Sequence, residues 1–148
     1  MKKILLFVCL LVAGFGTMAV ARNIDEKLVH TFREIYPDAV HVNWLEYPET
    51  YAVNFEQGNV KETIIFKKDG TFIKSTRYYM KEYLPYHLVA AIQEKYPEKK
   101  IFSVTEISSP YNIDYYIKLE DAKTWMTIKL DAEGNIKVLE KFRKALWK

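Results

Sequence analysis

Three histidines are the residues of this 148-residue chain best suited to hold a metal or to carry protons. They are His30, His41 and His87, and their positions show no metal-ligand spacing. A zinc site needs three or four clustered ligands, and Cys9, the only cysteine, lies inside an apolar N-terminal run. The sequence therefore predicts no metal site and no cofactor.

Serines and carboxylates also lack the surroundings of a catalytic site. No serine stands in a G-x-S-x-G context, and the glycines lie in the N-terminal run and in turns rather than in a phosphate-binding loop. Glu120 and Asp121 are adjacent, but they fall at a predicted hairpin turn, where acidic residues are common because they are solvated. We therefore predict that the protein is not an enzyme.

Aromatic residues are better candidates for a function, because the chain contains eleven Tyr, eight Phe and three Trp. Side chains alternate between the two faces of a strand. If Tyr115 faces the interior, Tyr116 and Lys118 face away, and Trp125 faces away when Met126 faces in. Aromatic residues among Lys, Arg and Thr are typical of protein-contact hot spots. The predicted contact residues are Tyr116, Trp125, Lys118, Ile65, Ile73 and Arg77.

Two other interpretations of the aromatic residues stay open. A cross-strand contact between Tyr116 and Trp125 can simply stabilise the sheet, by about 0.2 to 1 kcal/mol. A register shift of one residue would exchange the two faces. The tyrosine-rich stretch 78–86 is either a packed seam or the lining of a ligand cleft.

An internal repeat predicts the elements that carry these residues. The stretch "EIYPDA" (34–39) recurs sixty positions later as "EKYPEK" (94–99). Leu28, Phe32 and Tyr36 are four residues apart, so they line one stripe of a helix. Their counterparts in the repeat are Leu88, Ile92 and Tyr96. Each helix should bury this stripe.

Proline and turn residues delimit the elements. Asn23 or Asp25 can cap the first helix, and Pro85 suits the first turn of the second. Pro37 and Pro97 end the two helices. Alternating apolar residues and turn signals then predict a short strand followed by a three-stranded antiparallel meander in each repeat.

We therefore predict an α+β protein of two tandem units, each a helix on a four-stranded antiparallel sheet. The predicted boundaries are 1–21 for a signal peptide, 22–77 for the first unit, 78–84 for a connector and 85–148 for the second unit. A lone unit of about 60 residues buries only about 60% of its unfolded surface. The two units should consequently dock side by side.

The first 21 residues have the pattern of a Sec-type signal peptide. Two lysines precede an apolar run that ends in the small-residue pattern Ala19-Val20-Ala21. The alternative, a membrane anchor, is disfavoured because the run is short and Gly14 and Gly16 interrupt it. We expect cleavage near Ala21, no membrane insertion afterwards, and a periplasmic or secreted protein. The remaining chain has no cysteine, which favours a bacterial source.

Charge excludes one class of partner. Without the two lysines of the leader, 20 basic residues stand against 19 acidic ones, so no global field attracts nucleic acid. The C-terminal "KFRKALWK" could lie on a membrane surface as a short helix. Because it is only eight residues long, we predict the end of the last strand and a tail instead.

The order of these motifs resembles the PepSY-like group of beta-lactamase-inhibitor-like proteins. The shared motifs are F-x-x-x-Y-P-x-A (32–39), V-x-W (42–44), Y-x-V-x-F (51–55), D-G (69–70), L-P (84–85) and I-x-x-K-Y-P (92–97). The resemblance implies tandem helix-plus-four-strand modules in secreted or periplasmic proteins of Bacteroidetes, and relatives that act by binding other proteins. The second repeat departs from the pattern at Lys99, Lys100 and Val104. No inhibitory motif is shared, so inhibition does not carry over.

Together these observations predict a secreted, non-enzymatic protein that contacts a protein or peptide of the bacterial envelope through an open sheet face. Enzyme inhibition is a special case of this function. The alternative is a small-ligand or envelope-stress sensor that binds in a cleft between the two units. Substitutions at Trp125 and Tyr116 should impair the first function, and substitutions within 78–86 the second.

Overall fold

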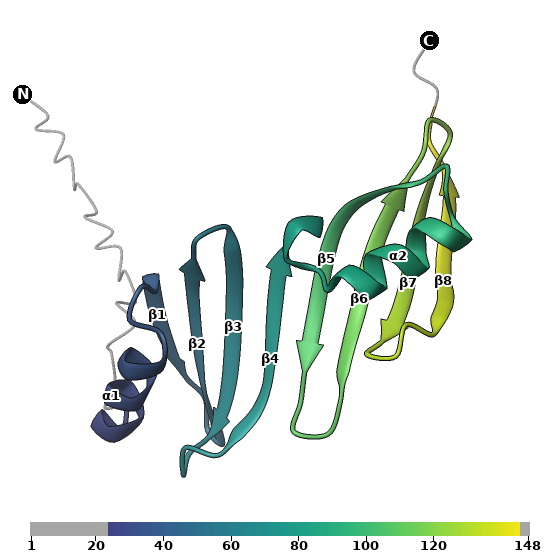
Figure 1. Cartoon of the computed structure of the whole chain (residues 1–148). Helices are drawn as coiled ribbons and strands as arrows, with labels where there is room; N and C mark the ends of the chain where they lie inside the picture. The colour runs from purple at the N-terminus through teal and green to yellow at the C-terminus, as the bar shows by residue number, and fades with distance from the viewer. Residues whose placement is uncertain (1–23, 146–148) are drawn as a thin grey trace, which may run out of the picture.

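The computed structural model describes residues 24–145, which form one antiparallel sheet, two α-helices and a short 3-10 helix (Figure 1). The elements are α1 (Glu26–Ile35), β1 (Val40–Glu46), β2 (Thr50–Gln57), β3 (Val60–Lys67), β4 (Phe72–Tyr79), η1 (Lys81–Tyr83), α2 (Tyr86–Lys95), β5 (Lys100–Ser108), β6 (Ile113–Glu120), β7 (Thr124–Asp131) and β8 (Ile136–Arg143). The predicted α+β class is confirmed. The predicted signal peptide and the end of the C-terminal tail lie outside the described residues.

All eight strands belong to a single sheet whose order follows the chain from β1 to β8. We expected two four-stranded sheets, but β4 and β5 pair from Ser75 opposite Ser108 to Tyr79 opposite Val104 and so join them. The division into units at 22–77 and 85–148 stays a prediction. Tyr78 and Tyr79, which we placed in the connector, are the last residues of β4.

Both helices begin and end where local chemistry predicts. The Asp25 carboxylate caps α1, because its Oδ1 atom accepts hydrogen bonds from the N–H groups of Lys27 at 2.8 Å and Leu28 at 3.3 Å. Pro85 directly precedes α2. Each helix stops at the Tyr of its Tyr-Pro pair, because the following proline cannot donate the next helical hydrogen bond.

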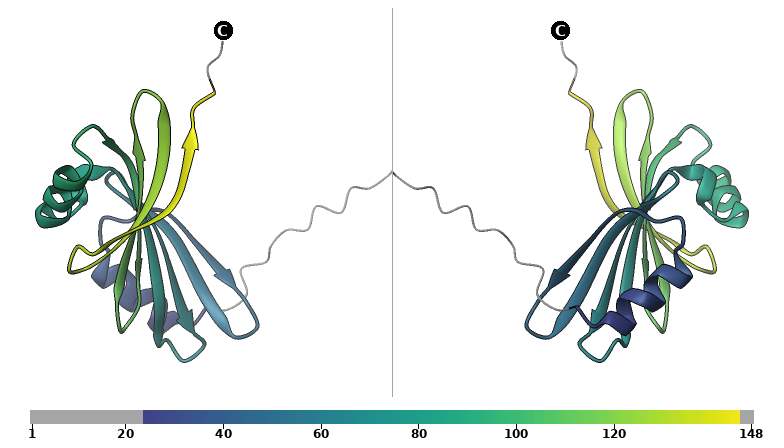
Figure 2. Two further views of the ribbon diagram at one scale, coloured as in Figure 1. Left: turned by 90° about the vertical axis from the view of Figure 1, so that its right-hand side faces the viewer. Right: turned by 90° about the vertical axis from the view of Figure 1, so that its left-hand side faces the viewer.

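The two helices lie on the same face of the twisted sheet (Figure 2) and cover separate apolar cores. Phe32 of α1 packs with Val53, Phe55 and Ile64 in the first core. In the second core, Leu88 and Ile92 of α2 are completely buried. They pack among Val104, Ile117, Leu119, Ile128 and Leu130. We call this face the helix side and the opposite face of the sheet the open face.

Within residues 24–145, no helix combines the length and the apolar character needed to cross a membrane.

Candidate protein-binding face

Strands β6 and β7 place their side chains as the alternation predicts. Tyr115, Ile117 and Leu119 are buried on the helix side, while Tyr116 and Lys118 point to the open face. On β7, Met126, Ile128 and Leu130 are buried in the same core. Trp125 therefore projects from the open face, as do the side chains of Thr127 and Lys129.

Trp125 is the centre of a group of side chains on the open face. The ring of Phe102 packs edge-on against it, with ring centres 4.9 Å apart. Phe142 lies directly opposite Trp125 on β8. The Nζ atoms of Lys118 and Lys144 lie 5.0 and 4.4 Å from the centre of the Trp125 ring, which is a cation–π geometry. We call these five residues the Trp125 cluster.

Three members of the Trp125 cluster were missed from the sequence. Phe102 reaches the open face because a bulge shifts the register of β5 on β6 between Ile101 and Ser103. Phe142 follows a second bulge, which shifts the register of β8 at Thr127 and Ile128 of β7. Simple alternation cannot anticipate these shifts, although an aromatic residue at the end of the last strand was a usable signal.

The strand register excludes the alternative of a cross-strand contact between Tyr116 and Trp125. Tyr116 lies opposite Lys129, whereas Trp125 lies opposite Glu120, so four residues of β6 or roughly 13 Å separate the two positions. The Lys129 ammonium lies 5.6 Å from the Tyr116 ring centre and pairs with Asp114 at 2.8 Å. This hydrogen bond to Asp114 raises the pKa of Lys129. Tyr116 therefore has neighbours of its own on the open face.

The predicted residues of the first repeat do not join this group. Ile65 lies on the open face of β3, opposite Ala52 of β2 and Lys74 of β4. Since β3 and β7 are four strands apart in the sheet, roughly 19 Å separates Ile65 from Trp125. Ile73 falls at a bulge, where the pairing of β4 passes from Phe72 to Lys74.

Arg77 points to the helix side, opposite to the face that we predicted. Its guanidinium lies 3.6 Å from the carboxylate of Glu62 and 3.3 Å from that of Glu106. Both carboxylates are buried. We placed Arg77 on the open face by counting alternate residues along the strand from Ile73, and the bulge at Ile73 reverses that alternation. Arg77 is stable on the helix side because it pairs there with Glu62 of β3 and Glu106 of β5.

Glu62, Arg77, Tyr79 and Glu106 form a buried polar group between the two apolar cores, which we call the seam cluster. The Tyr79 hydroxyl donates a hydrogen bond to Glu106 Oε2 at 2.5 Å, and burial together with this bond raises the pKa of Tyr79. Burial also raises the pKa of Glu62; Arg77 opposes this shift and the Glu106 carboxylate adds to it. The seam cluster joins β3, β4 and β5, so it holds the two halves of the sheet in register.

The tyrosines of 78–86 do not gather around one cleft. Tyr78 is exposed and lies opposite Thr105 on β5, while Tyr79 is buried in the second core. Tyr83 packs against the Tyr79 ring at 6.1 Å, and Tyr86 is almost fully exposed. These side chains therefore lie on different faces of the molecule. Among residues 24–145, no three His, Cys, Asp or Glu side chains are grouped so that they could hold a metal ion.

Sequence searches of protein families and of curated proteins find no match to the chain. Solved structures do share its fold. A BLIP-like protein from Bacteroides fragilis has a TM-score of 0.58 at 14% identity, over 85% of this chain and 90% of its own. A DUF2874 family protein from Bacteroides ovatus has a TM-score of 0.58 at 17% identity, over 82% of this chain and 88% of its own. A protein described as a candidate periplasmic protein, from Bacteroides eggerthii, has a TM-score of 0.57 at 14% identity, over 82% and 89%.

These likenesses define the class of the fold: this chain is a small α+β protein, with two helices on one face of an antiparallel sheet, whose fold is similar to that of a BLIP-like protein. At identities of 14 to 17% they show the fold alone. They agree with the beta-lactamase-inhibitor-like part of the resemblance seen in the sequence. The PepSY-like part of that resemblance stays a prediction.

Proposed function

We propose that this chain is a non-enzymatic binding protein that contacts a protein or peptide through the Trp125 cluster. The observation that carries this proposal is a group of aromatic residues on a sheet face that neither α1 nor α2 covers. Phe102 is 46% exposed and Phe142 is 59% exposed, on either side of Trp125. A partner that covered these rings would gain the free energy of burying apolar surface.

The surroundings of Trp125 favour an interface over a purely structural role. Phe102, Lys118 and Lys144 all contact the indole, so part of its side-chain entropy is already lost before binding. Aromatic anchors surrounded by polar residues are typical of binding hot spots. Lys118 and Lys144 beside the indole favour a partner that presents an apolar side chain with acidic neighbours.

The proposed contact surface revises the set of residues predicted from the sequence. Lys118 and Trp125 remain in it and are joined by Phe102, Phe142 and Lys144. Tyr116 shares the open face but lies outside the Trp125 cluster. Ile65 shares the open face at a distance and could contact only a partner that extends across the sheet. Ile73 and Arg77 are left out because of the bulge at Ile73 and the inward direction of Arg77.

We place this function in the bacterial periplasm or outside the cell. The sequence of residues 1–21 supports this location, and a structural neighbour is described as a candidate periplasmic protein. Enzyme inhibition would be one form of the proposed function, because a BLIP-like protein shares the fold. The proposed contact residues are the same whether or not the partner is an enzyme that the chain inhibits.

The decisive experiment is cross-linking and capture from a bacterial envelope fraction with the chain from Arg22. A Phe102→Ala, Trp125→Ala variant should lose the captured protein, since both rings belong to the proposed contact. The matched control is Tyr86→Ala, Tyr111→Ala, which removes two exposed aromatic residues outside the Trp125 cluster. Both variants must melt near the temperature of the unsubstituted chain.

Capture of the same proteins by all three forms would refute the proposal. Loss of capture in the control variant alone would also refute the proposal and would move the protein contact to the surface around Tyr86 or Tyr111.

A further inference from the structure

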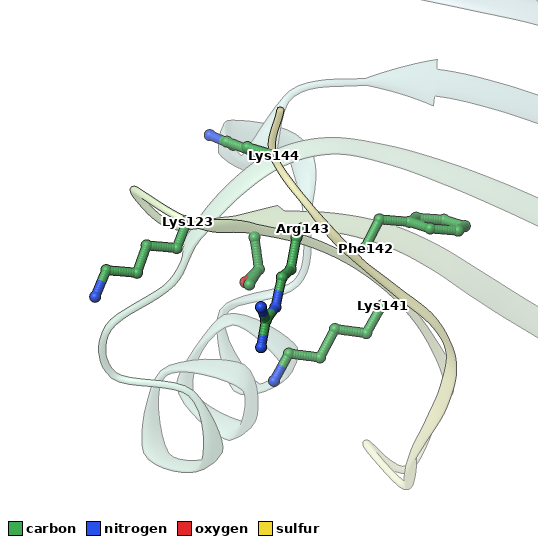
Figure 3. A pocket seen from close by; sticks show the side chains of 6 residues that line it. Lys123, Lys141, Phe142, Arg143 and Lys144 are labelled. Carbon is green, nitrogen blue, oxygen red and sulfur yellow. The ribbon is translucent and has the colours of Figure 1, made fainter. Parts of the chain in front are cut away.

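A hollow of about 720 Å³ lies where β7 begins and β8 ends, beside the Trp125 cluster (Figure 3). It is lined by Lys123, Thr124, Lys141, Phe142, Arg143 and Lys144. Four of these six residues are cationic. We call this site the basic hollow.

Strand geometry brings three cations to one side of the basic hollow. Lys141 lies opposite Met126, which is buried on the helix side, and Arg143 follows two residues later with the same orientation. Lys123 lies in the turn before β7, where its carbonyl oxygen accepts a hydrogen bond from the Lys144 N–H at 2.8 Å. In Figure 3 the side chains of Lys123, Lys141 and Arg143 extend in the same direction, whereas Phe142 points away.

Of the carboxylates nearest in sequence, Glu140 lies opposite Thr127 and so points to the open face, away from Lys141. Glu120 and Asp121 are already occupied. Glu120 pairs with Lys144 at 2.7 Å. Asp121 pairs with Lys99 and also accepts hydrogen bonds from the Lys123 and Thr124 N–H groups at 2.7 and 2.6 Å. In the part of the chain that the structure describes, Lys123, Lys141 and Arg143 form no ion pair. Three neighbouring like charges repel one another, and a bound anion would relieve this repulsion.

Protection of the sheet edge explains only part of this arrangement. β8 is an edge strand, and inward-pointing charges such as Lys141 and Arg143 prevent an edge from pairing with another chain. Lys123, however, lies in a turn and has no edge to protect. Edge protection does not require a hollow either. The position of Lys123 beside Lys141 and Arg143 therefore needs another explanation.

We propose that the basic hollow binds a phosphate-bearing ligand, with Lys123, Lys141 and Arg143 as its contacts. The planar Arg143 guanidinium can bind a phosphate through two parallel hydrogen bonds, and the two lysines add point charges. A volume of about 720 Å³ is much larger than one phosphate and lies in the usual range of ligand pockets. The ligand should therefore carry more than one anionic group or a phosphate attached to a larger body.

This proposal goes beyond the open-face function because its contact residues, Lys123, Lys141 and Arg143, are not members of the Trp125 cluster, although Phe142 and Lys144 adjoin both sites. It is tested by calorimetric titration of the chain from Arg22 with inorganic pyrophosphate, at low and at physiological ionic strength. The variant is Lys141→Gln, Arg143→Gln. The matched control is Lys27→Gln, Lys137→Gln, which removes the same charge at exposed positions of α1 and β8 outside the hollow.

Affinity for pyrophosphate should fall at least about tenfold in the hollow variant, because charge-assisted hydrogen bonds are lost. It should change by less than about twofold in the control, because exposed distant charges are screened by salt. If the hollow variant fails to fold, Lys123→Gln tests the same site from the turn.

A second arm distinguishes the two sources of such a phosphate. Sedimentation is measured with vesicles of phosphatidylcholine alone and with added phosphatidic acid. If the chain binds pyrophosphate and the hollow variant does not, the ligand is a free phosphate compound. If the chain binds only the vesicles with phosphatidic acid, and the hollow variant does not bind them, the ligand is a lipid headgroup. Equal weakening in both variants, or no binding to any of these probes, would overturn the proposal.

Discussion

The ring of Phe102 lies edge-on to the ring of Trp125, with the two planes at 83° and the ring centres 4.9 Å apart. This contact reaches from β5 to β7 across the strand between them, β6. It is possible because the bulge next to Ile101 turns Phe102 to the open face. The pair connects three strands on the side of the sheet that the helices leave uncovered.

The first prediction concerns this aromatic pair. A double-mutant cycle of Phe102→Ala and Trp125→Ala, measured by urea unfolding, should give a coupling free energy of about 0.5 to 1.5 kcal/mol. The same cycle with Tyr111→Ala in place of Phe102→Ala should give a coupling near zero, because Tyr111 is exposed in the β5–β6 loop. Additive effects of Phe102→Ala and Trp125→Ala would show that the rings do not support each other.

The second prediction concerns Arg77, which links two buried carboxylates. Arg77→Met should lower the free energy of unfolding at pH 7 by roughly 1 to 3 kcal/mol, because Glu62 and Glu106 lose their cation. Lys74→Met on the open face of the same strand is the control and should have a small effect. Arg77→Lys should restore only part of the stability, since an ammonium cannot span both carboxylates as a guanidinium does. Equal losses at positions 74 and 77 would contradict this account.

The third prediction concerns the pH dependence that Glu62 causes. Because burial raises its pKa, the folded chain binds the proton of Glu62 more tightly than the unfolded chain, whose value is near 4.5. This contribution is fully present below pH 4.5 and is lost as the pH rises through the pKa of the folded state. The unfolding free energy of Glu62→Gln relative to the unsubstituted chain should therefore increase between pH 4.5 and pH 7.

Chemical denaturation at both pH values measures this difference. Glu133→Gln, in an exposed turn, serves as the control and should show no comparable trend. A difference for Glu62→Gln that stays constant or falls with pH would mean that the carboxyl is not held in its neutral form.

The fourth prediction concerns the turn between β7 and β8. Gly134 has a φ of +88°, and a Cβ atom there would lie 3.5 Å from the Cδ2 atom of Leu88. Gly134→Ala should therefore cost about 1 to 2 kcal/mol of stability, mostly through backbone strain. The neighbouring substitution Glu133→Ala should cost much less. Equal melting temperatures for the two variants would refute the strain argument.

The sequence predicted the helices well because their signals are local. The four-residue spacing of Leu28 and Phe32, the Asp25 cap and the Tyr-Pro endings all act within one or two turns of helix. The facing of β6 and β7 was predicted for the same reason, since apolar and polar residues alternate there without interruption.

Features that depend on partners distant in the chain could not be predicted. Arg77 faces inward because Glu62 and Glu106 neutralise it, and these residues belong to other strands. Phe102 faces outward because of a bulge that is set by pairing with β6. The joining of β4 to β5 in one sheet likewise depends on tertiary packing. Lys123 entered no predicted site because its neighbours in space, Lys141 and Arg143, are about twenty residues away.

The strand order has a consequence for how the chain acquires its structure. Each strand pairs with the strand that immediately precedes it in the sequence. A strand can therefore join the sheet as soon as it has been synthesised. The largest loop to be closed is the one that contains η1 and α2, between β4 and β5. Pairing between consecutive strands lowers the mean sequence separation of contacts relative to a sandwich with crossing connections, and we expect this chain to fold faster than a sandwich of similar size. It can do so progressively from its N-terminal end, adding one strand at a time to a growing edge.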